Sequence, residues 1–182
     1  MHKLRTSQQI TTGLFAALAT ALRLVKNVAV GPVQFVNFPA VFTIMGGLMF
    51  GFKAGVFIGV ISFVLSDLLL GYAGIWTVVT SLSMGLVGFL SPLLRRLDAE
   101  SSIVGLGVSS YLLILAYDII SSMALLVPVV SLQTAFVWSI IGLFLPSAIT
   151  LYPVGLVTET VTVLLIVLLY PQVRRAWAEV KS

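Results

Sequence analysis

Cysteine, histidine and charge are all scarce in this chain. The 182 residues include no Cys and one His, His2, and only 9% of them are charged. Without Cys there is no disulfide, no thiolate metal ligand and no cysteine nucleophile. A single His beside the initiator Met leaves no residues for zinc-dependent or rhomboid-like chemistry. We therefore expect neither a metal nor a cofactor to be bound by this chain.

Apolar residues take the place of the missing charges. Hydrophobic residues make up 59% of the chain, which is more than the surface of a water-soluble domain of this size can carry. At roughly 20 residues per spanning helix, the length accommodates about six spans and short turns. We expect an all-α integral membrane protein, a six-helix bundle formed by one transmembrane domain over residues 1–182. The net charge of +4 comes from scattered basic residues, so nucleic acid is not an expected partner.

Charges, Pro and Gly divide the chain into predicted helices. The apolar run that contains Arg23 is followed by no small-x-small cleavage site, so we interpret it as a retained first helix. A shorter apolar piece over 133–145 is predicted to be re-entrant or to lie at the membrane interface. Residues 27–37 are expected to form a loop, and Pro171 is expected to end the last helix. The predicted spans are residues 8–26, 38–50, 54–70, 75–94, 103–127 and 152–170.

The distribution of Lys and Arg predicts the orientation. With six spans, one side of the membrane carries both termini and eight of the ten basic residues, and the other side carries Arg23 and Lys26. The side that is rich in Lys and Arg faces the cytoplasm, so both termini are predicted to be cytoplasmic. The eight residues are Lys3, Arg5, Lys53, Arg95, Arg96, Arg174, Arg175 and Lys181.

Four ionisable residues, Arg23, Asp67, Asp118 and Glu159, fall inside the predicted spans. Each costs several kcal/mol in hydrocarbon unless it faces a partner or water. A rise of about 1.5 Å per residue places all four at one level, roughly 20 Å from the cytoplasmic side. Arg23 can form a structural ion pair with one carboxylate, but it cannot neutralise three. The remaining carboxylates favour a polar cavity that opens to the outside.

Aromatic residues are predicted near the same level. Tyr72, Trp76, Tyr117 and Tyr152 are placed to stack on a flat ligand or to close over it. An ordinary aromatic belt at the membrane interface explains Trp76 and Tyr152 equally well.

Small residues recur at every fourth position of the first helix, at Gly13, Ala17 and Ala21. Such stripes let helices approach closely in lipid, so this one serves either packing within the bundle or the docking of another membrane subunit. A second series, Gly47 to Gly59 at the same spacing, is interpreted as packing within the bundle.

The segments GLFAALATALRLV, NFPAVFTIMGGLMFGFKAGVFIGVISFVLSDLLLG, YDIIS and TLYPVGLVTE follow one another along nearly the whole chain. In this order they resemble the S components of energy-coupling factor (ECF) vitamin transporters, which are prokaryotic inner-membrane proteins. The resemblance implies six helices that bind a vitamin or its precursor near the outer face. Glu159 departs from the pattern, because many relatives have a polar residue such as Asn there.

The resemblance also implies a gate and partner subunits. Carried over, the gate is the loop 27–37, with Asn27, Gly31, Pro32 and Asn37. The docking stripe, Ala17 and Ala21 with Gly13 before them, contacts a transmembrane coupling subunit that two cytoplasmic ATPases drive. The chain has no G-x-x-x-x-G-K-[ST] phosphate loop, so ATP is expected to be used by the partners.

Three acids against one Arg suit a cationic ligand such as thiamine or its pyrimidine precursor, although a protonated carboxyl also donates to a neutral ligand. A self-sufficient secondary transporter or cation channel is the alternative, weakened by the lack of an internal repeat. The pair Tyr117 and Asp118, with Asp67 as a second acid, raises an intramembrane aspartyl protease as the enzyme alternative. Asp67 lies in Leu-Ser-Asp, which does not match such a site, so no enzymatic activity is expected.

Overall fold

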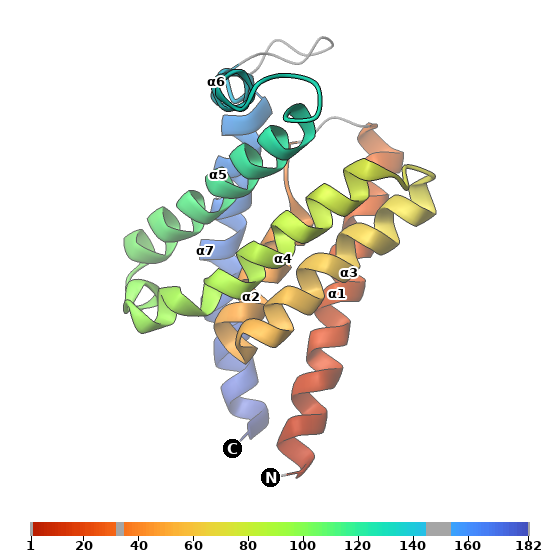
Figure 1. The fold of residues 1–182 in the computed structure, drawn as a ribbon. Helices are drawn as coiled ribbons and strands as arrows, with labels where there is room; N and C mark the ends of the chain where they lie inside the picture. The colour runs from red at the N-terminus through yellow and green to blue at the C-terminus, as the bar shows by residue number, and fades with distance from the viewer. Residues whose placement is uncertain (1, 32–34, 145–153, 182) are drawn as a thin grey trace.

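The computed structural model describes residues 2–31, 35–144 and 154–181, and within these ranges the chain forms helices and no strand (Figure 1). The all-α prediction is confirmed. The elements are α1 (His2–Val30), α2 (Phe38–Phe50), α3 (Phe52–Leu70), α4 (Ile75–Arg96), the short 3-10 helix η1 (Ala99–Ser101), α5 (Ile103–Leu126), α6 (Leu132–Gly142) and α7 (Val154–Lys181).

Five of these helices are long and apolar enough to cross a membrane, namely α1, α3, α4, α5 and α7. The remaining predicted span, residues 38–50, corresponds to α2, which has 13 residues. At 1.5 Å per residue it is about 20 Å long, shorter than a hydrocarbon core of about 30 Å. The count of six spans is therefore not confirmed. Instead, α2 is a short helix inside the bundle, and its residues from Pro39 to Leu48 are buried.

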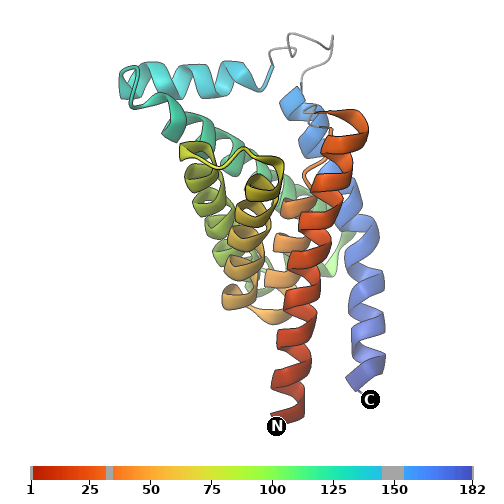
Figure 2. The same ribbon diagram turned by 90° about the vertical axis from the view of Figure 1, so that its right-hand side faces the viewer.

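The helix α6 does not run parallel to the other helices. It lies across one end of the bundle, at a steep angle to α1 and α7 (Figure 2). Its 11 residues correspond to about 17 Å of helix, too short to cross a membrane. The predicted short helix before the last span is present, and α6 covers the end of the bundle.

The first predicted loop begins too early. The helix α1 continues to Val30, and the Asn27 side chain donates to the Arg23 carbonyl at 3.0 Å. The helix ends at Gly31, whose φ of 79° suits glycine. Asn27 therefore lies in α1 and not in the predicted loop, because the Gly31 amide still donates to its carbonyl at 2.9 Å. The gating role of the α1–α2 connection stays a prediction. Pro32 lies outside the described residues.

The predicted end of the last helix is also wrong. The helix α7 passes through Pro171 and continues to Lys181. Proline removes one backbone hydrogen bond, and helices in membranes tolerate this loss when neighbouring groups support the turn. On either side of Pro171, α7 contacts Glu100 of η1. Arg174 pairs with the Glu100 carboxylate at 3.1 Å, and the Tyr170 hydroxyl donates to the same carboxylate. These contacts hold α7 against the α4–α5 connection.

Glycines set the distance between α3 and α4. A Cβ added to Gly55 would lie 2.3 Å from the Gly88 carbonyl oxygen, and one added to Gly59 would lie 2.7 Å from that of Met84. A Cβ at Gly47 of α2 would collide with Ser91 of α4, at 1.8 Å from its hydroxyl. The interpretation as packing positions is confirmed for Gly47, Gly55 and Gly59. It is wrong for Gly51, where a Cβ would meet nothing within 4 Å and the φ of 92° in the α2–α3 turn is what suits glycine.

The chain ends of α1 and α7 lie at the same end of the bundle (Figures 1 and 2). The C-terminal end of α1, the α3–α4 turn, the C-terminal end of α5, α6 and the start of α7 gather at the opposite end. This arrangement brings the predicted site residues, which are far apart in the sequence, into one region.

Candidate functional site

A cavity of about 260 Å³ opens at the end of the bundle away from the chain ends. Five of the residues that the sequence singles out line this cavity, namely Arg23, Asn37, Trp76, Tyr117 and Asp118. They come from α1, the N-cap of α2, α4 and α5. The remaining lining residues are Val36, Pro39, Phe63, Ser121, Ser122, Ser139, Gly142, Leu143, Gly155 and Thr158.

Three aromatic side chains, Phe63, Trp76 and Tyr117, line the cavity. The Phe63 and Tyr117 rings lie with their centroids 5.9 Å apart and tilted by 37°. The Arg23 guanidinium carbon lies 4.4 Å from the centroid of the Phe63 ring. Such a distance corresponds to a cation–π contact. Phe63 and Tyr117 are buried and contact each other, and Phe63 also contacts Arg23, so the half-exposed Trp76 offers the most accessible flat surface on which a ring system can stack.

Hydroxyl, amide and carboxyl groups complete the lining. They belong to Asn37, Asp118, Ser121, Ser139 and Thr158, together with Ser122. The Asn37 side chain also caps α2, by accepting from the Ala40 amide at 3.1 Å. The backbone N–H of Asn37 donates to the Thr162 hydroxyl of α7 at 2.9 Å, which ties the start of α2 to α7 beside the cavity. These groups can both donate and accept hydrogen bonds to a polar ligand.

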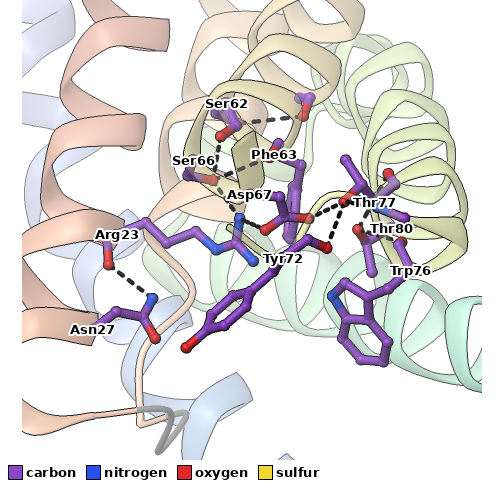
Figure 3. Close-up of polar contacts among 12 residues, drawn as sticks. Arg23, Asn27, Ser62, Phe63, Ser66, Asp67, Tyr72, Trp76, Thr77 and Thr80 are labelled. Carbon is purple, nitrogen blue, oxygen red and sulfur yellow. Dashed lines mark hydrogen bonds and ion pairs between the residues drawn. The ribbon is translucent and has the colours of Figure 1, made fainter. Parts of the chain in front are cut away.

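Arg23 and Asp67 form a buried ion pair (Figure 3). The Arg23 Nη1 lies 2.5 Å from the Asp67 Oδ1, and it also donates to the Ser66 hydroxyl. The Thr77 hydroxyl donates to the Asp67 Oδ2 at 2.8 Å. Asp67 is fully buried and does not line the cavity. A buried charge requires a partner and hydrogen bonds, and here α1, α3 and α4 supply them.

Glu159 is fully buried on α7 and does not line the cavity. Its carboxyl lies within interaction range of the Tyr111 hydroxyl and the Asp118 carboxyl, although neither contact has the geometry of a hydrogen bond. Asp118 itself is half-buried and faces the cavity. The four ionisable residues thus divide into an ion pair and a carboxyl pair.

One of the predicted aromatic residues, Tyr72, does not line the cavity. Tyr72 is 55% exposed in the α3–α4 turn, where its backbone amide donates to the Asp67 carbonyl at 2.8 Å. Trp76 lines the cavity and is also 52% exposed. Tyr152 lies outside the described residues.

Sequence reasoning missed several lining residues. Ser121 and Ser122 follow Asp118 by three and four positions, a spacing that places all three on one helix face. That signal was available in the sequence. For Ser139 the sequence contained no such signal, because the position of Ser139 depends on how α6 crosses the end of the bundle.

The small residues Gly13, Ala17 and Ala21 lie on the exposed side of α1, whereas Ala16 and Thr20 face the bundle. A Cβ added to Gly13 would meet nothing within 4 Å. Packing within the described part of the bundle therefore does not explain the stripe.

The fold and the composition define a multi-pass helical membrane protein with a cavity at one end of its bundle. The family described as ECF-type riboflavin transporter, S component, matches residues 3–170, and the chain belongs to this family. It is thus a substrate-binding subunit of an ECF transporter, and membership implies association with the transmembrane and ATPase modules of such a transporter. No curated protein and no solved structure matched the chain.

Proposed function

We propose that the chain captures a flavin, riboflavin or a close derivative, from outside the cell and presents it to an ATP-driven ECF transporter. The observation that carries the proposal is the lining of the cavity, which combines aromatic rings with several hydroxyl groups. Riboflavin has a flat tricyclic ring, which stacks on aromatic side chains, and a sugar-alcohol chain, which bonds to hydroxyl and amide groups. The description of the family names the same vitamin.

The charges near the cavity support a neutral ligand. The prediction of a thiamine-like cation rested on three acids against one Arg. Asp67 is occupied by Arg23, and Glu159 is buried behind Asp118, so Asp118 is the one carboxyl among the described residues that lines the cavity. The cationic ligand is therefore our second candidate, and direct competition between the two vitamins decides between them.

The proposed orientation places the cavity outside and the chain ends in the cytoplasm of a prokaryotic inner membrane. It is supported by the count of Lys and Arg and by the position of the cavity at the end away from the chain ends. Val36 and Asn37, which precede α2, line the cavity. We infer that the α1–α2 connection acts as the gate. The burial of Asp67 in an ion pair argues against a protease with two active carboxyls.

Ligand binding tests the proposal directly. We expect riboflavin to co-purify with the detergent-solubilised protein, as detected by mass spectrometry. Its fluorescence should fall on binding, because the ring stacks on aromatic side chains. Asp118→Ala and Ser121→Ala should each weaken binding by about tenfold, the loss expected for one hydrogen bond of about 1.4 kcal/mol.

Asp98→Asn serves as the control, because Asp98 is exposed in the α4–α5 connection, far from the cavity. Binding of thiamine with no binding of riboflavin would replace the flavin by the cationic ligand. Unchanged riboflavin affinity in both cavity variants would move the site elsewhere.

Docking and energy coupling form the second test. Ala17→Leu and Ala21→Leu place bulk on the exposed stripe of α1, so we expect normal ligand binding and loss of uptake in the assembled transporter. The matched control is Ala124→Leu, which adds the same bulk to an exposed position of α5. Proteoliposomes that contain this chain alone should show no uptake, because ATP is used by the partners. Proton-driven uptake by the chain alone would instead establish a secondary transporter.

A further inference from the structure

Two grooves on the surface of the bundle meet at Lys53. The first lies between α1 and the start of α3, where the polar Gln8, Gln9 and Thr12 face the apolar Phe50 and Ala54. The second is apolar and lies between α3 and α4, where it is lined by Val56 and Phe89 among others. Lys53 and Phe57 line both grooves. The grooves therefore share one basic side chain.

Lys53 lies in the first turn of α3, one of the helices long enough to cross the membrane. Its side chain is exposed, and no ion pair joins it to a carboxylate in the described part of the chain. The N-cap residue Gly51 supplies no side-chain hydrogen bond, so backbone N–H groups of the first turn add positive potential beside Lys53. Gln8 and Gln9 border the first groove and add amide donors.

We propose that Lys53 and the two grooves bind one diacyl phospholipid with an anionic headgroup. The phosphate contacts Lys53, and each groove holds one acyl chain. Two acyl chains joined to one phosphate match two grooves that adjoin at one cation, where Phe50, Ala54 and Phe57 form the apolar wall of the first groove. Since Lys53 lies at the end of the bundle that carries the chain ends, the lipid belongs to the cytoplasmic leaflet, where anionic lipids attract basic groups.

A lipid fits this surface better than a helix of a partner protein does. A helix laid in one groove would leave the other groove to separate lipids, and it would cover Lys53 without neutralising it unless it supplied an acid. A single phospholipid fills both grooves and neutralises the charge. The site is independent of the ligand cavity, which lies at the other end of the bundle.

Native mass spectrometry of the detergent-solubilised full chain tests the site, with phosphatidylglycerol, phosphatidylcholine or lysophosphatidylglycerol added. We expect one phosphatidylglycerol to be retained after the other two lipids have dissociated. Lys53→Gln should lower its affinity about fivefold, the loss expected for one basic residue at a membrane surface. Thr12→Trp fills the first groove without changing charge, and it should also reduce retention.

Lys53→Arg keeps the charge and should retain the lipid. Arg175→Gln removes an exposed basic residue of α7 that has no described ion pair, so it controls for net charge. Equal retention of phosphatidylglycerol and phosphatidylcholine by the unmodified chain would overturn the proposal. An equal loss of phosphatidylglycerol retention in the Lys53→Gln and Arg175→Gln variants would also overturn the proposal. Retention of the lysolipid as strong as that of the diacyl lipid would rule out the role of the second groove.

Discussion

Arg23 determines which of the ionisable residues near the cavity form an ion pair. Its side chain contacts Ser66, Asp67 and the Phe63 ring, so it joins α1 to α3 at the edge of the cavity. A common predicted depth makes three carboxylates possible partners of Arg23. The packing of α1 against α3 selects Asp67, and it leaves Asp118 to face the cavity.

The ion pair predicts a large loss of stability when one partner is removed. Asp67→Ala leaves the Arg23 charge buried without a counter-charge, which should cost about 3 to 5 kcal/mol of unfolding free energy. The measurement is the thermal unfolding of the detergent-solubilised protein. The double variant Arg23→Met with Asp67→Leu removes both charges and should recover most of the loss.

Asp98→Asn, at an exposed position, should leave the unfolding temperature unchanged. An Asp67→Ala variant as stable as the unmodified protein would mean that Arg23 has another counter-charge or reaches water.

At the scale of elements, α3 and α4 approach each other closely. The backbones meet at Gly55 and Gly88, where even one methyl group has no room. The two helices are joined by the short turn between Leu70 and Ile75, so they pack antiparallel along their length. In lipid, such packing replaces the hydrophobic drive that joins helices in water.

Two alanine substitutions on different helices test this packing. Gly55→Ala should destabilise the protein, because its Cβ would lie 2.3 Å from the Gly88 carbonyl oxygen and the helices would have to separate. Overpacking of this kind costs about 1 to 3 kcal/mol. Gly13→Ala is the matched control, since its Cβ meets nothing within 4 Å. Alanine there should leave stability unchanged or raise it by up to about 1 kcal/mol, because it favours helix.

The measurement is again the unfolding temperature of each variant. Equal losses in the two variants would show that helix propensity, and not the α3–α4 contact, controls the response.

At the scale of the whole molecule, the cavity and the chain ends lie at opposite ends of the bundle. This polarity suits a protein that binds its ligand on one side of the membrane and meets its ATPase modules on the other. The helix α6 covers the cavity end, and Ser139, Gly142 and Leu143 from α6 and the residues after it line the cavity.

The absence of Cys makes the polarity directly measurable. Single cysteines at Tyr72 and Gln133 should react with a membrane-impermeant maleimide in intact cells, because both exposed side chains belong to the cavity end. A cysteine at Leu97, exposed in the α4–α5 connection, should react only after the membrane is permeabilised. The reverse pattern would invert the proposed orientation.

Much of the architecture was predictable from local signals in the sequence. The composition required lipid, and the Gly, Pro and charged positions marked most helix ends within a few residues. Errors arose where a local signal was overridden. Pro171 did not end α7, because contacts around Tyr170 and Arg174 support the helix beyond it. Asn27 did not begin a loop, because α1 continues past it and the Gly31 amide donates to the Asn27 carbonyl at 2.9 Å.

The sequence by itself determined the class of protein, and it predicted four ionisable residues at a common depth inside the membrane. Composition and a constant rise per residue are enough for these conclusions. The structure adds Lys26, which is buried on α1 because that helix continues to Val30. Only the tertiary structure decided which charges pair, which aromatic residues line the cavity and which face of α1 stays exposed. These outcomes depend on the rotation of each helix about its axis. That rotation is set by close contacts between helices, such as Gly55 against Gly88, which no single helix specifies.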